Sequence, residues 1–144
     1  MKRVMSFGTF DHFHAGHEAY LKQAKALGDS LIVIIARDQT VKCIKGKLPD
    51  HNEKKRRAAV RASGIADKVA LGEKGDKYTV LRRYKPHVIA LGYDQFTFTF
   101  QLEKFLIDEK MDAKVVRMNP YRPKVYKTSL IRTQTSRIYA PQSL

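Results

Sequence analysis

The residues best suited to chemistry are concentrated in one N-terminal segment, GTFDHFHAGH, at residues 8–17. An apolar run at residues 4–7 precedes it and an amphipathic stretch follows, so we expect a strand, a tight loop and a helix start. Free N–H groups and the helix dipole make such a helix start an anion site. His14 and His17 can both face one ligand from that first turn. Because imidazole N–H groups donate to phosphate oxygens, the segment indicates phosphate binding.

Other interpretations of this segment stay open at the level of the sequence. The phosphate-binding pattern GxxxxGK[ST] and the dinucleotide pattern GxGxxG are both absent. His12, His14 and His17 could form a zinc cluster, although no cysteine or second nearby carboxylate completes a tetrahedral set. The histidines could also serve only as helix caps. His12 by itself is typical of a solvated loop residue.

Short apolar runs alternate with amphipathic stretches along the chain, which predicts a Rossmann-like, doubly wound α/β fold in a single domain. We expect a parallel five-stranded sheet with strands near residues 4–7, 30–36, 68–71, 87–91 and 113–118. Helices are expected near residues 16–27, 53–63, 77–84 and 100–110 and from residue 128, with a basic loop at 43–52. Such sheets bind ligands beyond the carboxyl ends of their strands. The loops at residues 8–15 and 92–98 and the segment before Thr128 should therefore converge.

The chain has a formal net charge of +14, and most of the excess lies in two segments. Residues 42–61 carry a net +6 and residues 114–144 a net +7, which leaves the rest close to balance. Two separate basic segments favour a site for a small polyanion. A basic RNA-binding protein is the alternative, although no RRM, KH or helix-turn-helix signature accompanies the charge.

Several features bear on the compartment. The single cysteine, Cys43, excludes an internal disulfide and fits a reducing environment. No apolar run approaches the roughly 20 residues that cross a bilayer, and the N-terminus lacks a signal-peptide pattern. We therefore expect a cytoplasmic protein without a membrane partner.

The string GTFD followed by HAGH resembles the hallmark of the cytidylyltransferase-like nucleotidyltransferase superfamily, an HxGH motif after a first strand. The resemblance implies that His14 and His17 stabilise the α-phosphate and the leaving group. It also implies that Asp11 lies toward the acceptor phosphate. The further nucleotide-binding positions that it implies in this segment are Gly8, Thr9, Phe10 and Gly16.

A second set of positions in this resemblance is basic. The segment Ala36-Arg37-Asp38, then Lys42 and the KGK string that starts at Lys45, look like the family's lysine-bearing loop. A lysine there can reach phosphate oxygens as a mobile point charge, so Lys42 is a candidate catalytic residue and Lys45 a candidate phosphate ligand. Arg56 aligns with an arginine near the start of the following helix. A solvated basic loop and an exposed helix face are the alternatives.

The remaining matches lie toward the C-terminus. Gly92 and Asp94 in LGYDQ resemble a Gly-x-Asp motif close to the base and ribose, and an ordinary turn is the alternative. Thr128 and Ser129 resemble a hydroxyl pair at a helix start that holds the outer phosphates. A second possible register is residues 132–136, which start at Arg132 but lack the motif's glycine, and a helix cap without a ligand is a further alternative.

Among the branches of the superfamily, the archaeal-type FAD synthases are most similar, through GDSLIVIIARDQTV, the KGK string and LGYDQ. The resemblance covers residues 1–132, whereas the tail at 133–144 departs from it. It implies transfer of AMP from ATP to FMN, with cytidylyl transfer from CTP to glycerol 3-phosphate or another phosphorylated small molecule as the alternative. It further implies Mg²⁺ held mainly by the nucleotide phosphates, without dedicated protein ligands. Related enzymes are often dimers, so a homodimer is an expectation.

Overall fold

The computed structural model of the 144-residue chain describes residues 1–73, 78–92 and 96–118, with the backbone alone at 96–101. In chain order the elements are β1 (Arg3–Gly8), α1 (Ala15–Lys25), β2 (Ser30–Ile35), α2 (Asp38–Lys45), α3 (Glu53–Ala62), β3 (Lys68–Leu71), α4 (Thr79–Tyr84), β4 (Val88–Leu91), α5 (Phe96–Asp108) and β5 (Lys114–Arg117). The helix expected from residue 128 and the tail lie outside the described residues.

The five strands form one parallel sheet in the order β3-β2-β1-β4-β5. The chain winds outward from β1 to β3 and then returns to the other side of β1 to form β4. This reversal places the topological switch point between β1 and β4. The predicted doubly wound parallel sheet of five strands is confirmed.

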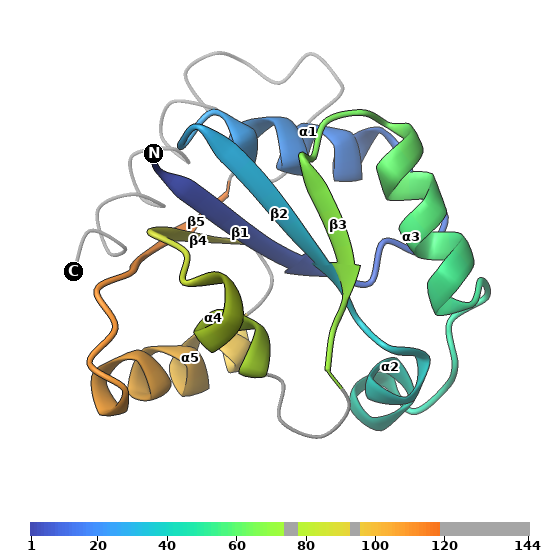
Figure 1. Ribbon diagram of the computed structural model, residues 1–144. Helices are drawn as coiled ribbons and strands as arrows, with labels where there is room; N and C mark the ends of the chain where they lie inside the picture. The colour runs from blue at the N-terminus through green and yellow to red at the C-terminus, as the bar shows by residue number, and fades with distance from the viewer. Residues whose placement is uncertain (74–77, 93–95, 119–144) are drawn as a thin grey trace, which may run out of the picture.

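Helices cover both faces of the sheet because alternate strand residues point to opposite sides. On one face α1 and α3 pack over a core that includes Val4, Leu31 and Val33. On the other face α4 and α5 pack over Met5, Ile32 and Ile34. In Figure 1 the two helix pairs lie apart around the strands, with α4 and α5 below the sheet.

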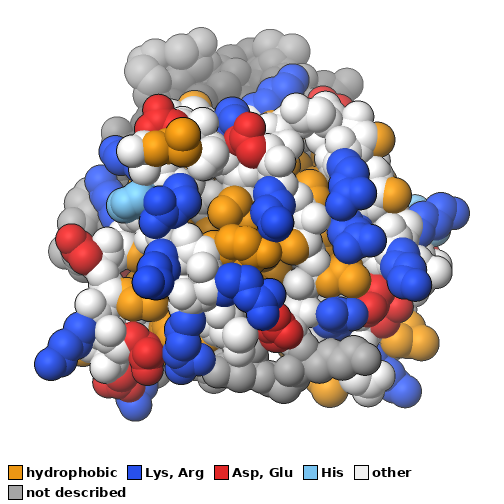
Figure 2. Space-filling model, in the orientation of Figure 1, with side chains coloured by type: hydrophobic (Ala, Val, Ile, Leu, Met, Phe, Trp, Pro, Cys, Tyr) orange, Lys and Arg blue, Asp and Glu red, His pale blue; other side chains and the backbone are white. Residues whose placement is uncertain are grey.

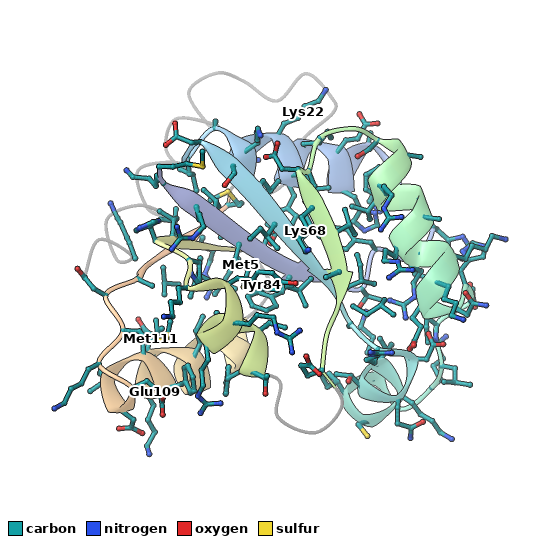
Figure 3. All side chains as sticks on the ribbon, viewed as in Figure 1. Met5, Lys22, Lys68, Tyr84, Glu109 and Met111 are labelled. Atoms are coloured by element: carbon teal, nitrogen blue, oxygen red, sulfur yellow. The ribbon has the colours of Figure 1, made fainter. Side chains whose placement is uncertain are left out.

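The core beneath α4 and α5 also includes partly buried residues. Buried Met5 of β1 belongs to this core, and Tyr84 of α4 and Met111, which follows α5, pack against it (Figure 3). The Nζ atom of Lys68 lies 5.6 Å from the centre of the Tyr84 ring, a distance at which a cation–π contact stabilises the pair. This contact joins the edge strand β3 to α4.

One element differs from the sequence prediction. Residues 43–45, expected in a basic loop, belong to α2, which begins at Asp38. Only Val41 of this helix is buried, and the helix is only eight residues long. The cap comes from elsewhere, because Oε1 of Glu53 accepts a hydrogen bond from the Asp38 N–H at 2.8 Å. Gly46, with φ of 84°, ends the helix.

The basic side chains are spread widely over the surface. Figure 2 shows Lys and Arg distributed across one face around a central group of hydrophobic side chains. Charge spread in this way does not mark a single nucleic-acid track on that face. Among the residues that the structure describes, no helix is long and apolar enough to span a bilayer.

Candidate active site

The ends of β1 and β4 lie side by side at the switch point, and α1 is anchored across them. The hydroxyl of Tyr20 lies 3.2 Å from the carbonyl oxygen of Phe7 and 2.8 Å from that of Ala90. These carbonyls lie near the carboxyl ends of the two strands. The start of α1 is therefore held over the crevice in which such sheets bind ligands.

The two histidines of the HxGH motif cap α1 reciprocally. The N–H of Gly16 donates to Nδ1 of His14 at 3.0 Å, and the N–H of His14 donates to Nδ1 of His17 at 3.2 Å. Because both Nδ1 atoms act as acceptors, each neutral ring carries its proton on Nε2. The backbone thus selects the tautomer in which both imidazoles present an Nε2–H donor.

The rings of His14 and His17 are stacked, with centres 3.8 Å apart and planes 22° apart. His17 also packs against Phe10 and Phe13, at 5.3 and 5.5 Å between ring centres. Burial, followed by the neighbouring His14 and opposed by Asp11, lowers the pKa of His17 to about 4. His17 is therefore a neutral hydrogen-bond donor at neutral pH rather than a cation.

Phe10 packs its ring against His17 and helps to hold His17 in place. Its ring is 3% exposed and stacks on Tyr20 with 6.1 Å between centres, while its backbone has φ of 55°. Gly8 allows the ring to approach, because a Cβ at Gly8 would lie only 2.6 Å from the Phe10 ring. The structure thus places Phe10 in the core beneath His17, and Gly8 next to it.

The two candidate lysines lie on a helix rather than in a loop. Lys42 and Lys45 are exposed residues of the last turn of α2. The charge of Lys45 contributes to lowering the pKa of His17, which places this ammonium group within electrostatic range of the HxGH motif. The role of Lys45 as a phosphate ligand stays a prediction.

Arg56, expected to contact phosphate, is instead 1% exposed and bound to protein groups. Its guanidinium donates to the carbonyl oxygens of His51 and Thr9 at 2.9 and 2.8 Å, and to Oδ1 of Asp38 at 2.6 Å. A buried guanidinium needs this set of acceptors. In this structure Arg56 fixes the loop that carries Thr9, which differs from a direct contact with a ligand.

Asp11, expected on the acceptor side, also binds protein groups. Its carboxylate accepts the N–H groups of Asp50 at 2.7 Å and His51 at 3.1 Å, and Oδ1 lies 3.1 Å from Nδ1 of His51. Burial, which by itself raises the pKa of Asp11, is outweighed by these backbone hydrogen bonds, which lower it. Asp11 ties the first loop to the loop after α2.

Sequence reasoning missed the network that orients α2. Arg37 donates to Oε2 of Glu53 at 2.9 Å and to the carbonyl oxygen of Gly72 at 2.6 Å. The pKa of Glu53 is lowered, first by the hydrogen bond from the N–H of Asp38 and despite partial burial. The only signal in the sequence was the ARD string after the second strand.

The remaining predicted residues are partly outside the described region. Gly92 follows β4, and its carbonyl oxygen accepts a hydrogen bond of 2.9 Å from Nη1 of Arg117. Asp94, Thr128 and Ser129 lie outside the described residues, so their roles stay predictions. Gly16 lies in the first turn of α1 and donates its N–H to His14, whereas the carbonyl oxygen of Thr9 accepts a hydrogen bond from Arg56.

A parallel sheet with a switch-point loop that ends in a reciprocally capped HxGH helix defines a nucleotidyltransferase. Residues 5–134 match the model of the cytidylyltransferase-like family, and the chain belongs to that family.

Within the family, the chain is similar to FAD synthases. It is 37% identical over 132 residues to the FAD synthase of Thermoplasma volcanium, which covers 92% of both chains. It is 48% identical over 118 residues to the FAD synthase of Methanosarcina mazei, which covers 82% of this chain and 77% of that one. These relatives confirm the resemblance to archaeal-type FAD synthases and do not favour the RNA-binding alternative.

Solved structures agree on the fold. A protein of Thermoplasma volcanium described as a lipopolysaccharide core biosynthesis protein superposes with a TM-score of 0.79 at 38% identity. The match covers 85% of this chain and 99% of that one. The pantoate-beta-alanine ligase of Francisella tularensis matches with a TM-score of 0.61 at 16% identity, covering 85% of this chain and 60% of that one, and shares the fold alone.

Proposed function

We propose that this chain is an FAD synthase, which transfers AMP from ATP to FMN and releases pyrophosphate. The observation that carries the proposal is the match with named FAD synthases over most of their own length. The HxGH geometry agrees with it, because two adjacent N–H donors suit a phosphoryl group rather than a nucleophilic triad.

The reaction needs positioning more than proton transfer. A phosphate oxygen of FMN attacks the α-phosphorus of ATP, the bond from that phosphorus to the bridging oxygen breaks, and pyrophosphate leaves. The attacking phosphate is already anionic at neutral pH, so no general base is required. The protein holds the two phosphates in line and stabilises the charge on the α-phosphoryl oxygens.

His14 and His17 supply that stabilisation through Nε2–H donors whose direction the backbone has already fixed. Donors that are pre-organised need no reorganisation as charge develops. Lys42 and Lys45, both in the last turn of α2, supply positive charge toward the triphosphate or the acceptor.

Mg²⁺ fits this site as an ion held mainly by the nucleotide. In the HxGH motif itself, the imidazoles of His14 and His17 present N–H donors, which do not coordinate a cation. The ion would neutralise the β- and γ-phosphates, where it takes phosphate and water oxygens.

The test uses the purified full chain with ATP, FMN and Mg²⁺, and measures FAD by chromatography together with pyrophosphate. We expect equal amounts of both products, and neither with a His14→Ala/His17→Ala double variant prepared identically. A parallel reaction contains CTP and glycerol 3-phosphate. Pyrophosphate from that mixture alone, or no FAD from the first, would overturn the proposal.

A further inference from the structure

Two Asp-His dipeptides face each other next to the HxGH motif, and the mechanism uses neither. Asp11-His12 lies in the loop after β1, and Asp50-His51 lies in the loop between α2 and α3. The histidine of each dipeptide pairs with the aspartate of the other. Nε2 of His12 lies 2.6 Å from Oδ2 of Asp50, and Nδ1 of His51 lies 3.1 Å from Oδ1 of Asp11.

The groups are gathered tightly enough for one ion. One ligand atom from each of Asp11, His12 and His51 lies within 4.8 Å of the others. The rings of His12 and His51 meet edge to face with 4.5 Å between centres. Ligands around a tetrahedral Zn²⁺ with bonds of about 2.0–2.1 Å lie ~3.4 Å apart. The pair formed by His51 and Asp11 is already near that spacing, and the exposed His12 needs only a small side-chain movement.

Backbone hydrogen bonds orient the Asp11 carboxylate, which anchors the cluster. The Asp11 carboxylate accepts the backbone N–H groups of Asp50 and His51, which fixes its direction independently of any ion. Backbone hydrogen bonds of this kind orient metal ligands in proteins. The side chains of His12 and Asp50 are 59% and 72% exposed, so an ion can enter from solvent.

The donor set selects the kind of ion. Two neutral imidazoles and two carboxylates give a charge of −2, which a divalent cation neutralises. Imidazole nitrogen suits Zn²⁺ and its first-row neighbours, whereas Mg²⁺ prefers oxygen and an octahedral shell. In the metal-free chain each imidazole faces a carboxylate across a hydrogen bond, and an ion would replace the shared proton.

We propose that Asp11, His12 and His51, beside the Asp50 carboxylate, form a structural site for Zn²⁺ or a similar divalent transition ion. The ion links the loop that leads to His14 with the loop that follows Lys45 on α2. It is distinct from the Mg²⁺ that accompanies ATP, and it does not depend on the proposed function.

The test titrates the metal-free full chain with Zn²⁺ alone by calorimetry, and with Co²⁺ alone by visible absorption. We expect one equivalent to bind, with the d–d spectrum of a tetrahedral Co²⁺ site and a higher thermal midpoint. His12→Asn and His51→Gln should each weaken Zn²⁺ binding at least ~10-fold. Asparagine is chosen at residue 12 because the backbone there has φ of 53°, which asparagine tolerates.

His87→Gln is the matched control, since it removes an exposed imidazole at the opposite end of the sheet and should bind Zn²⁺ like the original chain. Circular dichroism without metal checks that each variant folds. The proposal is overturned if the original chain binds no Zn²⁺. It is also overturned if His12→Asn and His51→Gln bind as tightly as the control, or if only a His14→Ala/His17→Ala variant loses binding.

Discussion

The backbone N–H of His14 donates to Nδ1 of His17, and this one hydrogen bond sets the direction of the His17 ring and the position of its proton. The donor belongs to the residue that caps α1, so the helix start and the His17 imidazole are one structural unit. Two substitutions of His17 can separate the cap from the donor.

His17→Ala should lower the rate of FAD formation at least ~100-fold, since it removes a donor to the transition state. His17→Asn places an oxygen near the position of Nδ1 and keeps the cap, but it lacks the distal N–H. We expect the His17→Asn variant to be as stable as the original chain but to form FAD slowly. His17→Gln reaches the position of Nε2 without the cap, so it should be less stable and retain more activity. Turnover and the urea midpoint of unfolding, measured for His17→Asn and His17→Gln, check both expectations. A His17→Asn variant that forms FAD at the normal rate would contradict the role of His17 as a donor to the transition state.

The pKa of His17, lowered to about 4 chiefly by burial, predicts how stability changes with pH. The unfolded chain binds a proton at this residue near pH 6.5, whereas the folded chain does so only near pH 4. Protonation therefore favours unfolding, and the contribution of the neutral ring is complete above pH 6.5 and is lost as the pH falls toward 4.

The measurement is the free energy of unfolding at several values between pH 7 and 4.5 for the original chain and for His17→Asn. The original chain should lose more stability over this range. Parallel curves, or an NMR titration of His17 near pH 6.5, would show that the ring is not buried as described.

The sequence was sufficient for the strands and the HxGH motif because both are local patterns. The buried strand at Ser30–Ile35 is a nearly continuous apolar run rich in β-branched residues, and β3 was predicted with its observed bounds. The contacts that place the side chains are long-range. Arg56 reaches Thr9 across 47 residues and Asp11 reaches Asp50 across 39, and no periodicity encodes such pairs.

A long-range contact also explains why helix α2 was not predicted. Its N-terminus is capped by Glu53, which lies 15 residues later and was interpreted only as the start of the next helix. The phosphate contact of Arg56 stays a prediction, because a positive charge near a phosphate site can bind either a ligand or protein groups. Only the structure shows that its guanidinium faces three protein oxygens.

Arg56→Ala should lower the free energy of unfolding by about 3 kcal/mol, because it leaves the Asp38 carboxylate without its partner and opens a space in the core. Arg61→Ala on the same helix is the control, since Arg61 is exposed and should change stability by less than about 0.5 kcal/mol. Denaturant unfolding of both variants checks the prediction. If Arg56→Ala is as stable as the original chain but binds ATP weakly, the result would instead support the direct phosphate contact predicted from the sequence.

Gly8→Ala tests whether the close approach of β1 and Phe10 matters for the site. The added Cβ would lie 2.6 Å from the Phe10 ring, which is enclosed by Phe13, His17 and Tyr20 and cannot move freely. Overpacking of this kind costs about 2 kcal/mol. Because the displaced ring supports His17, the rate of FAD formation should fall as well. Gly72→Ala is the matched control, since its Cβ would meet neighbouring atoms only at 3.5 Å or more. Equal stability of the two variants would show that the Phe10 ring relaxes without cost.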